Sequence, residues 1–361
     1  MLGLQLSKPF HLTSEWLTHA FSTPVRPGEF GNCSSKELEI FRRTIQVMMA
    51  VSFYPLSLSS WFFGGIVDQV ESLFEAKPYR VLKGKGEEKL FSNGSLTLLN
   101  LNACMLWGGL PILFGGVRPA SERIERLSSK ILLDWGSPDI VVMEEVSYGA
   151  ALALWQELKQ VYAHGFTRIS PMPWLMLDTG LFIAFKFPIV GTPVLHILPS
   201  NGTIKRGVFI LETLTCFIFA THLEAGDKEE DCSMRKKQLQ EIFALVNDVK
   251  ERSSKPCLLV GDLNIKREGI AFNEYTSSGI LEHFDDFYQP GIFNEATATC
   301  TNLLTAKATG KELVGSSWEL IDYILQAKGS QERLSLDVQL LPTYEGSESL
   351  SDHRGLLARK L

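Results

Sequence analysis

The feature that most constrains this chain is an alternation of short apolar runs and amphipathic stretches from about residue 95 onward. The runs SLTLLNLNACML, DIVVMEEV, GLFIAFKFPIV and CLLVGDLNI are typical of buried strands, and RGVFILETLTCFIFATHLEAG of a strand pair. PASERIERLSSKILLDW and RKKQLQEIFALVNDVKER instead carry apolar residues at helical spacing. Each apolar strand needs a helix or a second sheet to cover it, so we expect an α/β fold of two layered sheets flanked by helices. We place this single domain at residues 95–361.

The first 94 residues differ from this pattern. Residues 44–67, TIQVMMAVSFYPLSLSSWFFGGIV, carry no charge, and a helix of that length could cross the roughly 30 Å core of a bilayer. Pro55 and the Gly64-Gly65 pair disfavour a continuous spanning helix. We therefore expect a broken or hairpin-like segment at the membrane interface, with aromatic and basic anchors at Trp61, Phe62, Phe63, Arg42 and Arg43. A buried helix pair on the catalytic domain and a true span are the alternatives.

The N-terminus and the segment before residue 95 complete this picture. Residues 68–94 are polar and basic, as expected of a linker or hairpin. No charged stretch followed by an apolar run begins the chain, so no signal peptide is evident. The expected location is a membrane, bound peripherally or by the N-terminal segment, with the catalytic domain in an aqueous compartment.

Charge and cysteine usage exclude some kinds of site. The chain has 35 Lys and Arg against 41 Asp and Glu, a net charge of −6, which speaks against a surface that neutralises nucleic-acid phosphates. Its six cysteines lie far apart, without a CxxC pair or Cys/His zinc spacing. We therefore expect ordinary reduced thiols rather than a thiolate metal site.

Polar side chains recur at the ends of the apolar runs: Asn102, Glu145, His222, Asp262, Asn264, Asp322, Asp352 and His353. Taken singly, each has an ordinary structural explanation, such as a turn, a core histidine or a helix cap. Together, the carboxylates and amides would make an all-oxygen site for Mg²⁺. The two histidines would add a general base and a donor for the charge of the transition state. This set predicts metal-assisted attack of water on a phosphoester, without a covalent nucleophile.

The ordered motifs LNLNAC, MEEV, TGLFIAFKFPI, THLEAG, GDLNI, IDYIL and SDH resemble those of the endonuclease/exonuclease/phosphatase superfamily, of deoxyribonuclease-I-like fold. The resemblance covers residues 98–353 and implies a four-layered α/β/β/α sandwich of two mixed sheets. The details NACML, THLEAGD and TATCTN are most similar to neutral sphingomyelinases. Membrane-bound members of that group carry hydrophobic N-terminal segments, which implies that residues 1–94 are a membrane-associating helical extension and linker.

The resemblance implies a role for each strand-end residue. Glu145 would be the principal ligand of Mg²⁺, for which Mn²⁺ could substitute, with Asn102 helping to hold the metal or its water. Glu144 should face the other way, since strand side chains alternate. His353, which follows Asp352, would be the general base, and Asp322 would orient its ring. His222 would contact the phosphate. Asp262 and Asn264 would position the nucleophile. A second metal near Asp262 is a variant of this scheme.

One departure from the membrane-bound sphingomyelinases concerns a switch pair. Those enzymes have an Asp-Lys pair before the strand that here reads RGVFIL, where this chain has Asn201 and Arg206. Regulation by that pair is therefore not expected to carry over. Arg206 could still contact a phosphate.

Two apolar loops favour a lipid substrate. Residues 105–117, MLWGGLPILFGGV, follow the predicted metal site directly, and residues 171–177, PMPWLML, form the second loop. Exposed together they would make a contact surface, although both could instead pack under the N-terminal segment. We expect hydrolysis of sphingomyelin to ceramide and phosphocholine at a membrane surface. The alternatives are another superfamily hydrolase, acting on nucleic acid, inositol phosphates or phospholipid, and a membrane-docked binding protein with a vestigial site.

Overall fold

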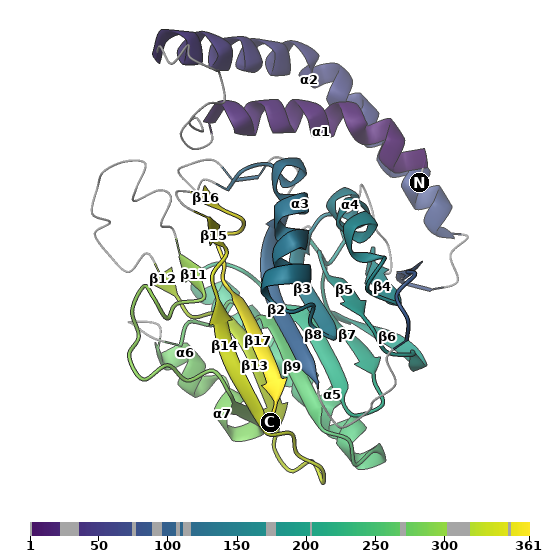
Figure 1. Cartoon of the computed structure of the whole chain (residues 1–361), viewed down its shortest axis with the longest axis vertical. Coiled ribbons are helices and arrows are strands. Elements are labelled where there is room, and N and C mark those ends of the chain that lie inside the picture. The colour runs from purple at the N-terminus through teal and green to yellow at the C-terminus, as the bar shows by residue number, and fades with distance from the viewer. Residues whose placement is uncertain are drawn as a thin grey trace.

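The computed structural model describes residues 2–21, 36–73, 77–88, 96–105, 109–110, 117–170, 178–202, 204–267, 272–301, 318–345 and 348–361. Most of the apolar loop at 105–117, including Trp107 and Phe114, and all of the loop at 171–177 lie outside these residues. The described part contains two large sheets packed face to face, with helices on both outer faces (Figure 1).

The first sheet has seven strands in the order β1-β4-β5-β3-β2-β17-β14. Its members are β1 (Arg80–Lys83), β2 (Thr97–Met105), β3 (Ile140–Val146), β4 (His164–Thr167), β5 (Phe182–Phe185), β14 (Leu336–Leu341) and β17 (Gly355–Lys360). Strands β2 and β3 are parallel, and the other pairs are antiparallel. The sheet is therefore mixed, and β2 lies inside it between β3 and β17.

The second sheet has six strands in the order β10-β13-β9-β8-β7-β6. Its members are β6 (Val190–Leu198), β7 (Arg206–Glu212), β8 (Phe217–His222), β9 (Cys257–Asp262), β10 (Phe284–Asp286) and β13 (Asp322–Ala327). Its one parallel pair is β8 and β9. Two short ribbons complete the strands, β11 (Cys300–Thr301) with β12 (Trp318–Glu319) and β15 (Tyr344–Glu345) with β16 (Glu348–Ser349).

Helices cover the outer face of each sheet. On the first lie α3 (Ala120–Ser129), which continues as a π-helical turn (Lys130–Asp134), and α4 (Tyr148–Leu158). On the second lie α5 (Glu229–Arg252), α6 (Phe272–Ser277) and α7 (Ile280–His283). One apolar core lies between the sheets and one beneath each helical layer. The four-layered α/β/β/α sandwich is thereby confirmed.

One strand prediction is wrong. The run GLFIAFKFPIV divides into two strands, because β5 ends at Phe185 in the first sheet and β6 begins at Val190 in the second. The chain crosses between the sheets at Lys186, Phe187 and Pro188, and Pro188 has no N–H to offer a ladder. An apolar run that spans two layers cannot be told from a single buried strand by composition alone.

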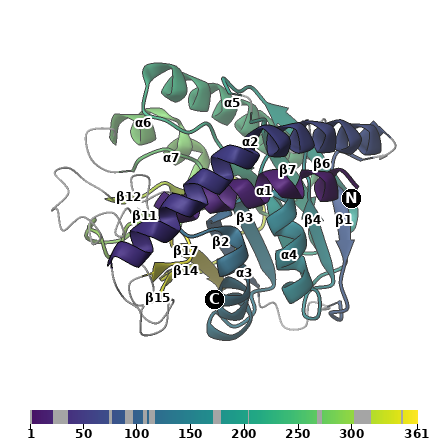
Figure 2. The same cartoon turned by 90° about the horizontal axis from the view of Figure 1, so that it is seen from above.

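The N-terminal segment forms an antiparallel helix pair, α1 (Leu2–Phe21) and α2 (Lys36–Leu73). Ring contacts join the two helices, with centroids 5.3 Å apart for Phe10 and Trp61 and 6.5 Å apart for Trp16 and Phe53. The predicted break at Pro55 is wrong, because α2 runs through it as one helix. A proline removes a single N–H bond, so a helix braced along its side can bend there instead of ending, and α2 bends along its length (Figure 2).

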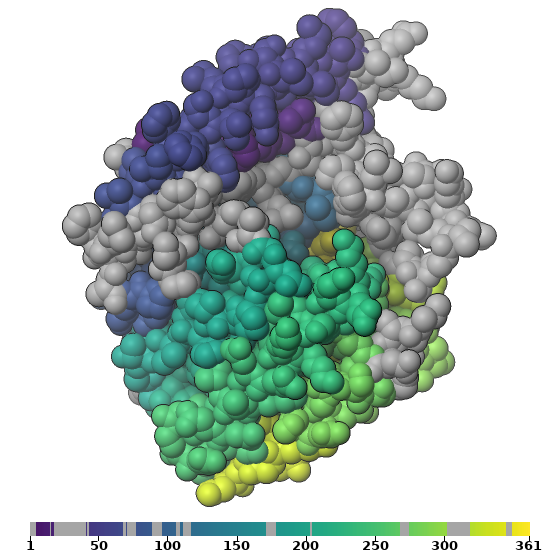
Figure 3. Space-filling view, turned by 180° about the vertical axis from the view of Figure 1, so that it is seen from behind, coloured from purple at the N-terminus to yellow at the C-terminus, as the bar shows by residue number. Residues whose placement is uncertain are grey.

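The helix pair lies across one end of the molecule (Figures 1 and 3). Strand β17 points away from the pair toward the C label in Figure 1, and β2 is antiparallel to β17. The carboxyl end of β2 therefore faces the helix pair.

The division of the chain at residue 95 stays a prediction. The structure adds that β1, which precedes residue 95, pairs with β4 at the edge of the first sheet. Tyr79, next to β1, is buried in the core between the sheets. The sandwich therefore draws on residues 79–83 as well.

Candidate active site

The predicted site residues come together at the carboxyl ends of β2 and β3 in one sheet and of β8 and β9 in the other. His222, the last residue of β8, lies opposite Asp262, the last residue of β9. Asp322, the first residue of β13, lies opposite Asp262 on its other side. Gly261 permits this close register, since a Cβ there would lie 1.8 Å from the Thr221 carbonyl oxygen and its φ is +150°.

Asn102 joins the carboxylates of the two sheets. Its amide nitrogen donates hydrogen bonds to Glu145 Oε1 at 3.1 Å and to Asp262 Oδ2 at 3.0 Å. Its amide oxygen accepts the Cys104 N–H at 3.1 Å. In this arrangement Asn102 orients two carboxylates, and an oxygen of Glu145 is left to face a ligand.

The backbone is strained at three positions around this pair. Cys104, Glu145 and Asn264 have φ values of +46°, +54° and +53°, in the left-handed region that non-glycine residues rarely occupy. Such strain costs on the order of 1–3 kcal/mol per residue and concentrates at functional sites. At the end of β3, Glu145 is partly exposed while Glu144 is fully buried.

Glu144 occupies an unexpected environment. Neither carboxylate oxygen has a hydrogen-bond partner among the described residues. Burial raises its pKa well above the usual value, and the carboxylates of Asp322 and Asp262 raise it further. Glu144 therefore lies within the electrostatic influence of the site although its side chain is buried apart from Glu145.

His353 and Asp322 form a buried ion pair. His353 Nδ1 donates to Asp322 Oδ2 at 2.8 Å, which orients the ring and leaves Nε2 toward Asp262 Oδ2 at 3.8 Å. Burial alone would lower the pKa of His353, but the Asp322 carboxylate reverses this and raises the pKa well above its usual value. The backbone N–H of Asp322 in turn donates a hydrogen bond to the Thr299 hydroxyl oxygen at 3.2 Å.

His222 differs from His353 in its electrostatics. Its Nε2 lies 3.7 Å from Asp262 Oδ2. Burial lowers its pKa well below the usual value, and the charges of Arg206 and His353 lower it further. The pKa values of the two histidines are thus shifted in opposite directions, as expected where two histidines have different roles.

The remaining predicted residues line the same place. Asp352 is partly exposed and raises the pKa of Glu145, which burial already raises. Burial and the Asp322 carboxylate also raise the pKa of Asp262, to about 7. Asn264 donates its backbone N–H to Asp262 Oδ1 at 2.8 Å and its amide to the Leu223 carbonyl at 3.2 Å. Asn264 therefore braces Asp262.

Arg206 is a buried cation beside the acids. It begins β7, and Glu224, Asp262 and Glu145 act on its pKa, which burial lowers. Its Nε has no hydrogen-bond partner among the described residues. An unpartnered guanidinium N–H at this place could donate to a phosphate oxygen.

Two residues that frame the site were not among the predicted site residues. Buried Arg123 donates to the carbonyls of Ala103 at 3.0 Å, Cys104 at 2.6 Å and Leu350, so it joins the end of β2 to the segment before Asp352. Ser351 Oγ donates to the Asn102 carbonyl at 2.6 Å and accepts the His353 N–H at 3.1 Å. Ser351 belongs to the SDH motif, and Arg123 lies in the stretch PASERIERLSSKILLDW, which was predicted only as a helix.

Comparisons with known proteins identify the family and the fold. The sequence profile described as "Endonuclease/Exonuclease/phosphatase family" matches residues 100–353. Sphingomyelinase C from Streptomyces griseocarneus superposes with a TM-score of 0.52 at 16% identity, covering 74% of this chain and 100% of that one. A mutant beta toxin from Staphylococcus aureus with bound magnesium ions gives 0.52 at 17%, covering 74% and 100%.

Other structures of the same fold process different substrates. D. rerio TDP2, complexed with a single-strand DNA product, gives a TM-score of 0.53 at 17% identity, covering 74% of this chain and 99% of that one. No curated protein sequence matches the chain significantly. At these identities the likeness establishes the fold and leaves the substrate open.

Proposed function

Because the chain belongs to the endonuclease/exonuclease/phosphatase family of metal-dependent phosphoric diester hydrolases, we propose that it hydrolyses sphingomyelin to ceramide and phosphocholine. The observation that carries this proposal is the position of an outward-facing apolar helix at the end of the sandwich that holds the site. The roles of the catalytic residues and the membrane location are part of the same proposal.

The donor set fits Mg²⁺. Burial and the Asp352 carboxylate raise the pKa of Glu145, and burial and the Asp322 carboxylate raise that of Asp262, so a divalent cation beside these acids would relieve their repulsion. Glu145 would be the main ligand, with Asn102 holding its carboxylate in place, and Mn²⁺ could substitute. When bound, the ion would supply charge neutralisation at the phosphate and a more acidic water. The donor atoms of Asp262, Asp322 and His353 also lie within 4.8 Å of one another, which keeps the second-metal variant open.

The side chains divide the proton chemistry. His353 Nε2 would accept the proton of the attacking water, while Asp322 holds the opposite ring nitrogen. Neutral His222 would donate a hydrogen bond to the phosphate or the leaving oxygen. Asp262, braced by Asn264, would orient the nucleophile, and Arg206 Nε would donate to a phosphate oxygen.

The helix pair has large apolar residues on its outer face, and small buried residues lie between the helices beside the ring contacts that join them. Ala50 and Ser57 on α2, and Ser7 on α1, are buried, whereas Met48 and Leu56 are 63% and 66% exposed. Small residues between helices and large apolar residues outside are typical of helix pairs in lipid, where packing and not water exclusion joins the helices. This arrangement favours membrane contact over the alternative of a helix pair buried on the catalytic domain.

The helix α2 is long enough for either mode of membrane contact. Among the described residues, Arg43–Val67 is the one helical stretch that could cross a bilayer by length and composition, and 22% of its most apolar window is buried. We propose that the pair lies in the interface, because the site-bearing end of β2 faces it. Interfacial docking would bring the lipid headgroup level with Glu145 and His353.

The proposal is tested with the purified full chain, Mg²⁺ and vesicles of sphingomyelin in phosphatidylcholine. We expect release of phosphocholine, and Glu145→Gln to lower its rate by orders of magnitude, because metal and base act together. Glu125→Gln, an exposed carboxylate on α3, is the matched control and should retain activity.

Each of the other outcomes contradicts a specific part of the proposal. If single-stranded DNA or an inositol phosphate is cleaved while sphingomyelin is not, the lipid assignment fails and another hydrolase of this family is correct. If Glu145→Gln retains full activity on sphingomyelin, the metal assignment fails. If no phosphoester is cleaved, the vestigial binding protein is correct.

A further inference from the structure

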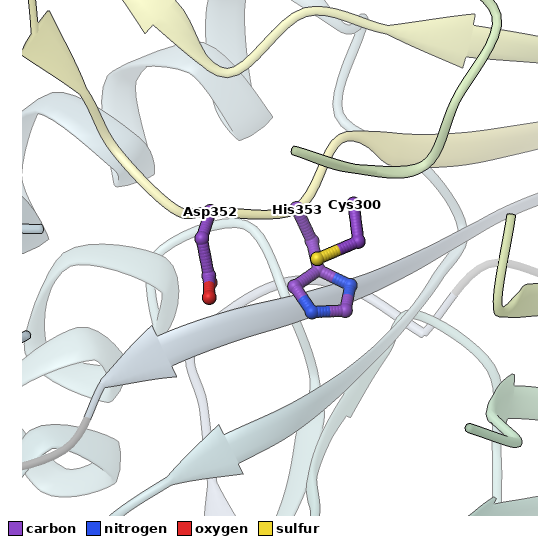
Figure 4. Close-up of side chains that lie close together, drawn as sticks. All are labelled: Cys300, Asp352 and His353. Carbon is purple, nitrogen blue, oxygen red and sulfur yellow. The ribbon is translucent and has the colours of Figure 1, made fainter. Parts of the chain in front are cut away.

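A thiol, a carboxylate and an imidazole converge on the rim of the site. Cys300, Asp352 and His353 each offer one ligand atom, and these three atoms lie within 4.8 Å of one another (Figure 4). Sequence spacing indicated no thiolate metal site, because Cys300 and His353 are far apart along the chain. The cluster exists only in the folded molecule.

Backbone pairing fixes the cluster. Cys300 and His353 form an antiparallel bridge. On either side of it, the Thr301 N–H donates to the Asp352 carbonyl at 2.9 Å, and the Arg354 N–H donates to the Thr299 carbonyl at 2.6 Å. The thiol is therefore held against the imidazole by the fold, and it is partly exposed, so an ion could enter.

The donor set suits a softer cation than Mg²⁺. Thiolate and imidazole favour Zn²⁺, which takes such ligands at roughly 2.0–2.3 Å in tetrahedral sites. His353 Nδ1 is already bound by Asp322 at 2.8 Å, which leaves Nε2 free to act as a ligand. A carboxylate on the second ring nitrogen is the usual support of a zinc-bound histidine.

We propose that Cys300, Asp352 and His353 bind Zn²⁺, and that the bound ion blocks hydrolysis by occupying His353 Nε2. Zn²⁺ displaces the proton of the Cys300 thiol to solvent as the sulfur–metal bond forms, so binding weakens as the pH falls. The blocking step rests on the proposed role of His353 as general base. The binding step does not.

Binding is measured first and without substrate. Titration of the metal-free full chain with Zn²⁺ is carried out in a Glu145→Gln background, which removes the main ligand of the predicted Mg²⁺ site. We expect one ion per chain and a loss of affinity of at least about 10- to 100-fold in Cys300→Ser. Cys232→Ser, which removes another partly exposed thiol, should bind like its parent. Co²⁺ should show a thiolate charge-transfer band that Cys300→Ser lacks.

Inhibition is measured second, on chains with Glu145 intact. For each variant, the rate with Zn²⁺ is divided by its own rate with Mg²⁺ alone. Zn²⁺ should inhibit the parent and Cys232→Ser but not Cys300→Ser. Equal affinity in Cys300→Ser, or a Co²⁺ complex without the thiolate band, overturns the site. A chain that binds Zn²⁺ through Cys300 but cleaves no phosphoester leaves the site standing and overturns the proposed function instead.

Discussion

At the scale of single residues, the contrast between the two buried histidines organises the site. Asp322 raises the pKa of His353, while burial and the charge of Arg206 lower the pKa of His222. A general base must be unprotonated to accept the proton of water, so raising the pKa of His353 makes it a stronger base that is available only at higher pH. The pair with Asp322 should therefore be visible in the pH dependence of the rate.

Asp322→Asn tests this coupling. Without the carboxylate, the pKa of His353 should fall, so the rise of kcat/KM with pH should move to lower pH. The maximal rate should drop by roughly 10²- to 10⁴-fold, because the ring loses its orientation and its basicity. The measurement is kcat/KM across pH for phosphocholine release, with Asp337→Asn, an exposed aspartate on β14, as the control. A profile that keeps its position on the pH axis would refute the base assignment.

Many of the site residues could be predicted, because a polar side chain at the end of a buried apolar strand is costly unless it has a partner. Asn102, Asp262, Asp322 and His353 all stood out in this way, and the structure brings them together. The contacts themselves could not be predicted. Whether the amide of Asn102 presents nitrogen or oxygen to Glu145 depends on the Cys104 N–H, which a strained backbone turns toward it.

At the scale of elements, α2 shows how tertiary packing overrides local propensity. Helix interiors disfavour Pro55 by about 3 kcal/mol, which a sequence reading takes as a break. Packing against α1 favours continuation of the helix. Ser57 and Ser59 donate to the carbonyls of Tyr54 and Pro55 at 2.8 and 2.9 Å, and such bonds often accompany helix bending. The identity of the partner helix was not visible in the sequence.

Phe62→Ser combined with Phe63→Ser tests the outer face of α2. The two side chains are 46% and 61% exposed. Each phenylalanine side chain should stabilise membrane binding by up to about 1.5–3 kcal/mol. Partitioning of the double variant into vesicles should therefore fall by at least about tenfold. Hydrolysis of a water-soluble substrate should be unchanged. The control combines Leu133→Ser and Ile292→Ser, which are exposed on the sandwich. Equal loss in both variants, measured by vesicle sedimentation, would contradict docking through α2.

At the scale of the whole molecule, the site is the meeting point of two sheets that share no hydrogen-bonded edge. The alternating pattern predicted two layers, but it could not assign strands to sheets. The division of GLFIAFKFPIV between β5 and β6 shows why, since nothing in an apolar run marks a change of layer. The site geometry therefore depends on packing between the sheets as much as on the residues that touch substrate.

Leu356→Ala tests that dependence. Leu356 is fully buried in the core between the sheets and lies opposite Asn100 in β2. Its truncation should lower the free energy of unfolding by about 2–5 kcal/mol. Leu361→Ala, 80% exposed, should stay within about 0.5 kcal/mol of the parent. Denaturant unfolding measures both, and equal stability of the two variants would contradict the assigned packing.

The insertion of β17 between β2 and β14 also has a consequence for biosynthesis. The first sheet cannot close until Gly355–Lys360 has emerged to join a strand made some 250 residues earlier. His353 lies just before that strand. A nascent chain from which β17 has not yet emerged therefore lacks a closed first sheet, and its predicted site residues are not yet brought together.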